Sequence, residues 1–231
     1  MEIRVVRSVK EKNKELAHDV REHLRRRRGV MFNFMSSPGS GKTTFLEKLI
    51  PLLQQRGHRP AIIEGDVTTA IDAERLNHLG IPISLINTEK FGGSCHLGPN
   101  VVLGALETLS SDEFDVVLIE NVGNLICPAS YDTGSNENFV LLSVTEGEDK
   151  PLKYPVVFKR TSASLITKID LVEPLGFDVE ALRRNILTVN PDHRLFELSS
   201  RSGVGLVDFA DYLSERAGLY ADAIAGKQID G

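Results

Sequence analysis

Residues 31–49, MFNFMSSPGSGKTTFLEKL, decide the fold that we expect for this chain. The apolar start predicts a strand, residues 36–43 predict a phosphate-binding loop, and the residues after them favour a helix. Gly39 and Gly41 let backbone N–H groups approach oxyanions without a Cβ in the way. Although Ser36 stands where the GxxxxGK[ST] pattern begins with glycine, this order of strand, loop and helix predicts a nucleotide-binding P-loop.

The polar side chains of this loop suit the phosphates and the magnesium ion of a nucleotide. Lys42 can reach the β- and γ-phosphates, and the Thr43 hydroxyl can ligate Mg²⁺. The helix that begins here points its positive end at the anion. The predicted nucleotide contacts from the loop are Pro38, Gly39, Ser40, Gly41, Lys42, Thr43 and Thr44.

Acidic residues at two later strand ends fit the metal of such a site. Asp66 follows the strand predicted at 61–64 and Glu120 ends a continuous apolar strand, and acids at both places can hold Mg²⁺ or its bound water. Gly123 comes three residues after Glu120, the spacing with which nucleotide switches bring a backbone amide to the γ-phosphate. Asp66 and Asp72 are candidates for orienting the attacking water, although Asp72 also fits a helix start.

The tetrapeptide TKID at 167–170 resembles the guanine-reading sequence, with Thr where Asn is usual. An ionised Asp170 accepts two hydrogen bonds from N1–H and the 2-amino group of guanine, and adenine lacks the matching donors. The Lys168 stem can lie along the base. Ser199 follows the strand predicted at 195–198, where backbone amides line the base in such proteins. The sequence therefore predicts guanine rather than adenine.

The composition fits one ordinary α/β domain. Of the 231 residues, 41% are hydrophobic and 26% are charged, which excludes a disordered or fibrous protein. The formal net charge of −5 argues against nucleic acid as the main partner, because binding to phosphate backbones needs a basic surface. Two cysteines make no disulfide framework, and no stretch approaches about 18 consecutive apolar residues. We therefore expect a soluble, cytoplasmic protein without a membrane segment.

Strands alternate with helices along the rest of the chain. This order predicts a doubly wound, mostly parallel sheet with helices on both faces, the fold of P-loop NTPases. Residues 8–28 predict an exposed N-terminal helix, so that 1–29 form an extension and 30–231 the nucleotide-binding domain. The four arginines at 25–28 suit an anionic partner or membrane surface, or simply a solvated helix end. A short helix is expected around residues 152–158, and a helix over 204–216 closes the domain.

Both cysteines and one histidine form a second group of chemically active residues. Cys95 adjoins His96, and Cys127 lies four residues after Gly123, so both cysteines fall beside loops at or near the nucleotide side of the sheet. Thiolate and imidazole suit Zn²⁺, Ni²⁺ or copper, yet cysteines are often only buried and this spacing lacks a CxxC pair. Two chains paired about a two-fold axis would complete a site that three ligands leave open. The other histidines are expected to be exposed: His18, His23, His58, His78 and His193.

Several of these stretches together resemble one family, the hydrogenase nickel-incorporation GTPases called HypB, relatives of the urease accessory GTPase. The resemblance runs from about residue 30 to 207 and rests on FMSSPGSGKTT, EGDV, DAER, CHL, ENVGNLICP, LLSVTEGEDKPLKYP and TKIDLVE. CHL paired with ENVGNLICP is far more specific than a P-loop. The Cys-rich or His-rich N-terminal tracts of many family members do not appear before Gly29.

The resemblance implies a Mg²⁺-dependent GTPase that forms a homodimer with GTP and turns it into GDP and phosphate. It implies Ni²⁺ or Zn²⁺ at the dimer interface on Cys95, His96 and Cys127, and transfer toward a hydrogenase large subunit with a partner maturation chaperone. By the same match, the phosphate, magnesium and base contacts are Lys42, Thr43, Asp66, Glu120, Lys168 and Asp170.

Two other functions fit the same residues. A P-loop kinase or ATPase with structural zinc would prefer ADP to GDP. A non-catalytic metal-binding protein would use the nucleotide only to hold its fold.

Overall fold

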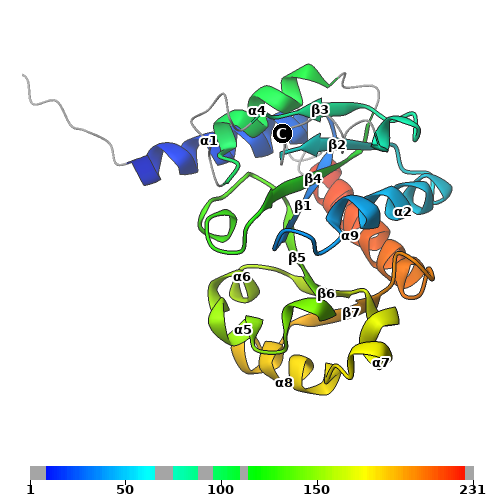
Figure 1. Ribbon diagram of the computed structural model, residues 1–231. Coiled ribbons are helices and arrows are strands. Elements are labelled where there is room, and N and C mark those ends of the chain that lie inside the picture. The colour runs from blue at the N-terminus through cyan, green and yellow to red at the C-terminus, as the bar shows by residue number, and fades with distance from the viewer. Residues whose placement is uncertain (1–8, 66–74, 88–95, 110–113, 227–231) are drawn as a thin grey trace, which may run out of the picture.

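The centre of the molecule is one parallel sheet (Figure 1). The computed structural model describes residues 9–65, 75–87, 96–109 and 114–226. In these ranges the strands are β1 (Val30–Ser36), β2 (Pro60–Glu64), β3 (Ile83–Leu85), β4 (Val116–Gly123), β5 (Glu137–Ser143), β6 (Ala163–Thr167) and β7 (Arg194–Leu198). Their order is β3-β2-β4-β1-β5-β6-β7, and every neighbouring pair is parallel.

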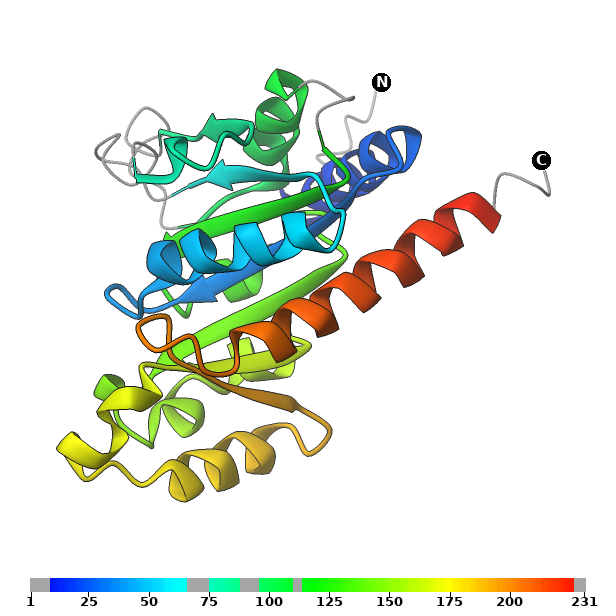
Figure 2. The ribbon, with the colours of Figure 1, turned by 90° about the vertical axis from the view of Figure 1, so that its right-hand side faces the viewer.

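Helices cover both faces of this sheet. Figure 2 shows α2 and α9 in front of it, and buried side chains of both helices share one apolar cluster with the strands. α1, α4, α6 and α8 contribute to two clusters on the opposite face. The helices are α1 (Val9–Arg26), α2 (Lys42–Gln55), α4 (Pro99–Thr108), α5 (Lys150–Lys153), α6 (Pro155–Lys159), α7 (Val172–Leu175), α8 (Val179–Val189) and α9 (Leu206–Gly226), with short 3₁₀ turns η2 (Pro128–Ser130), η3 (Val144–Glu146) and η4 (Ile169–Leu171). The predicted doubly wound fold with an N-terminal helix is confirmed.

The position of β1 explains where a ligand site must lie. β1 is buried along its whole length, as expected for a continuous apolar strand covered on both faces. It pairs with β4 on one side and β5 on the other, so the chain order reverses on either side of it. Ligands bind at the carboxyl ends of strands at such a switch point. The loop after β1 therefore opens at the centre of the sheet's carboxyl edge.

The N-terminal helix is less exposed than the sequence indicated. Val20 is 0% and Leu24 2% exposed, and both lie in one buried cluster with α4. Arg27 Nη1 donates hydrogen bonds of 3.2 and 2.9 Å to the carbonyl oxygens of Leu106 and Leu109. The prediction of an exposed helix holds for its charged face, whereas its apolar stripe covers the sheet and Arg27 of the basic run binds the end of α4.

Two element boundaries also differ from the predictions. The segment expected as one helix over 152–158 is two short helices, because Pro155 lacks an N–H and opens α6 as its first residue. The last helix continues ten residues beyond 216, and Figure 2 shows it running past the sheet. In the described ranges, no helix combines the length and apolar character needed to cross a bilayer.

His193 is buried, contrary to the expectation that it is exposed. It is 6% exposed, and its Nε2 lies 2.8 Å from Ser164 Oγ. Its Nδ1 lies 3.1 Å from Nδ2 of Asn190. Burial lowers the pKa of His193 from 6.5 to about 4, so the imidazole is neutral near pH 7.

Candidate nucleotide and metal sites

The loop after β1 has the backbone conformation that a phosphate loop needs. Gly39 and Gly41 adopt left-handed φ values of 74° and 91°, which side chains with a Cβ rarely tolerate. Lys42 is only 6% exposed, and its Nζ donates a 2.8 Å hydrogen bond to Ser36 Oγ. The serine that departs from the motif is therefore a partner of the loop lysine.

Thr43 and Glu120 meet where this loop faces the end of β4. The Thr43 hydroxyl donates to Glu120 Oε1 at 2.8 Å, and Glu120 is 3% exposed. Hydroxyl and carboxylate oxygens are the hard ligands that Mg²⁺ prefers, so these two residues fit that ion. Gly123 pairs in register with Ser36, which places the end of the acid-x-x-Gly segment beside the start of the phosphate loop.

One buried acid at this edge had no assigned role in the sequence. Glu64 ends β2, is 0% exposed and is the register partner of Glu120. Two carboxylates thus lie side by side near the phosphate loop, Glu64 at the end of β2 and Glu120 within β4, three residues before that strand ends. The signal was present in the stretch EGDV, where Glu64 is the last residue of an apolar strand.

Two adjoining cavities surround the loop. The first has a volume of about 390 Å³, and the second of about 360 Å³, within the range of small-ligand sites. The residues that line both are Ser40, Gly41, Thr44 and Lys168. The first cavity adds Pro38, Gly39, Lys42, Thr43, Arg75 and Glu120. The second adds Thr167, Asp170, Leu171, Ser200 and Arg201.

The TKID segment is fastened to the phosphate loop. Lys168 takes a left-handed backbone conformation with φ 59°, and its Nζ donates to Gly39 O at 2.7 Å. Thr167 Oγ1 donates to Ser40 O at 2.8 Å. The hydroxyl of the threonine that replaces the usual asparagine therefore makes one of the two contacts that join these segments.

Ser199 orients the carboxylate of Asp170. Its Oγ donates to Asp170 Oδ1 at 2.5 Å and accepts from Ser202 N at 3.1 Å. Ser199 itself is fully buried after β7. The sequence predicts a backbone amide of this residue near the base, whereas the contact in the structure is made by its side chain.

Arg75 also lines the first cavity, and no motif in the sequence predicts a role for it. Its Nη2 donates to Thr44 Oγ1 at 3.2 Å and to Glu47 Oε2 at 3.1 Å. The guanidinium adds a positive charge to the rim of the cavity that holds Lys42. The only signal was its place in the stretch DAER.

The segments that carry His96 and Cys127 come together. The His96 ring stacks on Tyr131 with a centroid distance of 3.5 Å and an interplanar angle of 17°. Burial lowers the pKa of His96 below 6.5, which favours the neutral imidazole that can bind a metal. Cys127 is half-buried, and its N–H donates to Asn124 Oδ1 at 3.3 Å.

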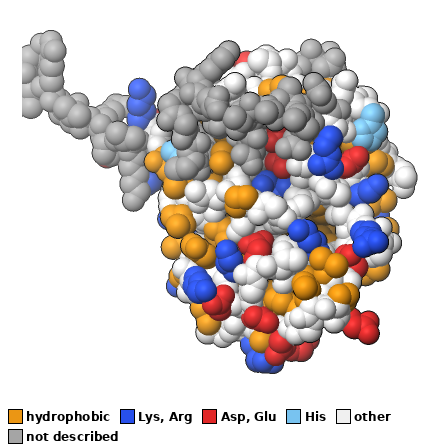
Figure 3. Space-filling model, viewed as in Figure 1, with side chains coloured by type: hydrophobic (Ala, Val, Ile, Leu, Met, Phe, Trp, Pro, Cys, Tyr) orange, Lys and Arg blue, Asp and Glu red, His pale blue; other side chains and the backbone are white. Residues whose placement is uncertain are grey.

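Three predicted site residues, Asp66, Asp72 and Cys95, lie outside the described residues. Among the residues that are described, no cluster of three or more His, Cys, Asp or Glu side chains forms a metal-sized site. Asn124 and Tyr131, which contact Cys127 and His96, were missed, because neither belongs to a ligand motif. On the described part of the face in Figure 3, basic and acidic side chains are intermixed.

The nucleotide-binding domain of the CobW/HypB/UreG family matches residues 30–197. The hydrogenase maturation factor HypB of Azotobacter chroococcum is 42% identical over 217 residues, which are 94% of this chain and 70% of that protein.

Two crystal structures agree with this match. HypB from Helicobacter pylori in complex with nickel has a TM-score of 0.83 at 39% identity, covering 89% of this chain and 95% of that one. HypB from Archaeoglobus fulgidus has a TM-score of 0.82 at 35% identity, covering 90% of this chain and 99% of that one. The phosphate loop, its acid partner and these similarities together show that the chain belongs to the HypB family of hydrogenase maturation factors.

Proposed function

We propose that this protein is a Mg²⁺-dependent GTPase that carries nickel for the maturation of a hydrogenase. The observation that carries the proposal is the joining of phosphate loop and TKID segment, through Lys168 to Gly39 and Thr167 to Ser40. Because of these contacts the phosphate cavity and the second cavity adjoin, and one nucleoside triphosphate can occupy both.

Phosphate chemistry in this cavity is mainly a matter of positioning. Water attacks the γ-phosphorus, the bond from that phosphorus to the β–γ bridging oxygen breaks, and GDP and phosphate leave. Lys42 supplies positive charge beside the β- and γ-phosphates, and Asp66 or Asp72 orients the water. Mg²⁺, when held by Thr43 and Glu120, neutralises charge on the phosphate oxygens.

Guanine specificity rests on Asp170 in the second cavity. Its carboxylate accepts from N1–H and the 2-amino group of guanine, while Ser199 keeps it in one orientation. An adenine base in the same place leaves the carboxylate without matching donors. Lys168, whose stem already spans the loop, lies along the base.

The metal cargo is held by Cys95, His96 and Cys127. A neutral imidazole and thiolates suit Ni²⁺ and Zn²⁺ alike, and the Helicobacter pylori relative has been crystallised with nickel. Three ligands per chain leave such a site open, so two chains paired about a two-fold axis complete it. GTP favours this homodimer, and the metal passes to a hydrogenase large subunit with a maturation chaperone.

A competition experiment tests the nucleotide part of the proposal. Bound GDP should resist displacement by ADP and be displaced by GTP, and Mg²⁺-dependent release of phosphate from GTP should be measurable. Preference for ADP would instead favour a P-loop ATPase or kinase.

A separate test addresses the cargo. The alanine variants Cys95→Ala and Cys127→Ala should each lose Ni²⁺ uptake while they keep GDP affinity. Full uptake in both variants would exclude the assigned ligands.

A further inference from the structure

Amide side chains occupy the middle of the sheet, where the surrounding residues are apolar. Asn33 lies within β1 and is 1% exposed, and Asn121 lies within β4 and is 0% exposed. Asn138, at the start of β5, is the register partner of Asn33. The three central strands of the sheet thus each contribute one asparagine to a single row.

Hydrogen bonds join the row from one end to the other. Asn121 Nδ2 donates to Asn33 Oδ1 at 2.9 Å, and Asn33 Nδ2 donates to Asn138 Oδ1 at 2.8 Å. Ser135 Oγ donates to the same Asn138 oxygen at 3.1 Å, and Thr133 Oγ1 donates to Ser135 Oγ at 3.0 Å. We call these five residues the amide row.

One backbone group fixes the direction of the whole row. The N–H of Val122 donates to Asn121 Oδ1 at 2.9 Å, and a backbone N–H can only donate. Asn121 must therefore present its amino group to Asn33, and Asn33 must in turn present its own to Asn138. A change in the position of the Val122 N–H alters the pairing that every later amide in the row requires.

The inner end of the row lies in the segment that faces the nucleotide. Asn121 follows Glu120, whose carboxylate accepts from Thr43, and Gly123 lies in register with Ser36 of the phosphate loop. Val122, the donor that orients the row, stands directly before Gly123. A γ-phosphate that engages the Gly123 amide therefore acts next to the donor that sets the row.

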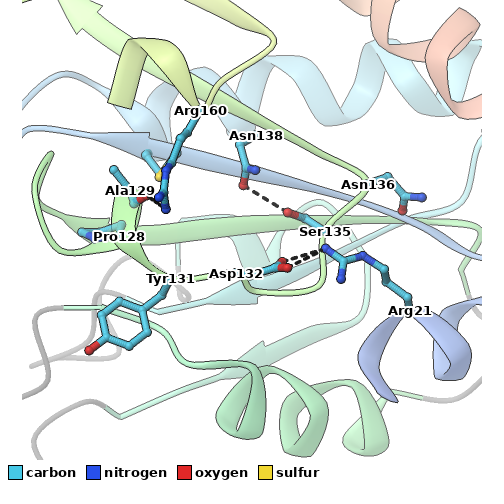
Figure 4. Close-up of a pocket in the computed structure, with 10 residues that line it drawn as sticks. Arg21, Pro128, Ala129, Tyr131, Asp132, Ser135, Asn136, Asn138 and Arg160 are labelled. Carbon is cyan, nitrogen blue, oxygen red and sulfur yellow. Dashed lines mark hydrogen bonds and ion pairs between the residues drawn. The ribbon is translucent and has the colours of Figure 1, made fainter. Parts of the chain in front are cut away.

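The outer end of the row lies in the segment 131–136, which is fixed against the rest of the chain. Figure 4 shows the hydrogen bond from Ser135 to Asn138 and the ion pair of Arg21 with Asp132. Arg21 Nη2 lies 2.7 and 2.9 Å from the two carboxylate oxygens of Asp132. Gly134, with φ 83°, sits so close to α1 that a Cβ would approach the Val20 side chain to 2.5 Å. These contacts join the segment to α1, so its position depends on α1 as well as on the amide row.

The same segment begins at Tyr131, whose ring contacts His96. Tyr131 stacks on His96, and Cys127 precedes Tyr131 by four residues. The amide row therefore connects the nucleotide-facing end of β4 with the segment that positions one predicted metal ligand and adjoins another.

We propose that the amide row is a positioning device that couples the state of the nucleotide to the affinity for the metal. This inference rests on the proposed GTPase and nickel functions. Buried amides are costly unless each donor and acceptor is matched, so the row favours one arrangement of its two ends over intermediate ones. Engagement of the γ-phosphate selects the arrangement at one end, and the His96 and Cys127 segments follow at the other. Reciprocally, bound metal must change the affinity for the nucleotide by the same factor.

The test uses Asn33→Leu, which removes the central amide at nearly constant side-chain volume. The Kd for Ni²⁺ is measured by calorimetry in the presence of GDP and of a non-hydrolysable GTP analogue. We expect the two values to differ by at least about fivefold in the natural protein, as is usual for coupled sites, and by less than about twofold in the variant. GTP turnover and GDP affinity are measured in the same preparations.

Ser164→Ala is the matched control. Ser164 is a fully buried polar residue of β6 whose hydroxyl pairs with His193, so its loss disturbs the same sheet without touching the amide row. This variant should keep the natural ratio of Ni²⁺ Kd values. Thr133→Val is a milder second variant, which removes one donor at the outer end and carries the test if Asn33→Leu does not fold.

The outcomes separate this inference from the proposed function. The absence of GTP turnover or of Ni²⁺ binding in the natural protein would contradict the proposed function itself. The amide row would be overturned as the coupling path if Asn33→Leu and Thr133→Val both kept the natural ratio of the two Ni²⁺ Kd values. It would also be overturned if Ser164→Ala lost that ratio as fully as Asn33→Leu.

Discussion

Two regions of this molecule are built in different ways. The nucleotide edge comprises the phosphate loop and the TKID segment, and the Cys127 side comprises the amide row and residues 124–136. At the nucleotide edge, each residue belongs to a short motif at a strand end, and single hydrogen bonds join the motifs, such as Lys168 to Gly39. On the Cys127 side, the arrangement depends on a continuous row of side-chain hydrogen bonds. In that row the one amide group of Asn33 accepts from Asn121 and donates to Asn138. The first region can be changed one motif at a time, whereas the second responds as a unit.

The largest effect is expected at the nucleotide edge. Lys42→Ala removes the buried ammonium of the phosphate loop and should lower GTP turnover by at least about 100-fold, the usual loss for one preorganised charge-stabilising donor. Single-turnover measurement of phosphate release checks this prediction. Ni²⁺ affinity with GDP should stay within about twofold, since the amide row is intact. A parallel loss of Ni²⁺ affinity would remove the distinction between the two regions.

His193, which pairs with Ser164 and belongs to neither region, should make the free energy of unfolding depend on pH. Burial lowers the pKa of His193 to about 4, whereas in the unfolded chain it is about 6.5, so the unfolded state binds the extra proton between these values. Stability should therefore fall as the pH decreases from about 6.5 to 4, by at most about 3 kcal/mol. Urea unfolding at several pH values measures this, and His193→Gln should flatten the curve over that range. An unchanged slope in the variant would assign the dependence to other groups.

Replacing one carboxylate oxygen of Asp170 should change which base the protein binds. Asp170→Asn replaces an acceptor oxygen by a donor NH₂, so GDP affinity should fall by about 10-fold or more. Xanthosine diphosphate, which has a carbonyl where guanine has its 2-amino group, should gain affinity in the same variant. Displacement of a fluorescent nucleotide measures both. GDP affinity equal to that of the natural protein would show that Asp170 does not contact the base.

The smallest effect is expected at the loop before Cys127. Asn124 Oδ1 accepts from the N–H groups of Ile126 and Cys127 at 2.7 and 3.3 Å, so Asn124→Ala frees that turn. Ni²⁺ affinity should weaken by about fivefold, in line with about 1 kcal/mol for a lost hydrogen bond. The weakening should be equal with GDP and with the GTP analogue, unlike that of Asn33→Leu. A loss confined to one nucleotide state would place Asn124 in the coupling path.

The sequence predicted the sheet and the phosphate loop because both depend on local patterns. The apolar runs at residues 31–35 and 115–120 predict strands buried on both faces, and Gly39 and Gly41 stand where positive φ values occur. The helix predicted over 152–158 was wrong in its bounds, because Pro155 opens a new helix.

The amide row was not predictable from its residues. A lone Asn in an apolar strand, such as Asn33 in VMFNFMS, gives no sign of which distant side chain will satisfy it. Only the pairing of β1 with β4 and β5 places three such residues side by side. The burial of His193 and of the N-terminal helix was missed for the same reason, because tertiary contacts and not local spacing determine it.

The link between nucleotide, dimer and metal can be tested by measuring chain mass and bound Ni²⁺ together, by light scattering with metal analysis of the eluted peak. With the non-hydrolysable GTP analogue, we expect the mass to double relative to the 25.5 kDa chain and Ni²⁺ to elute with the dimer. With GDP, we expect a lower mass and less bound metal. The same mass and the same metal content with both nucleotides would contradict this link.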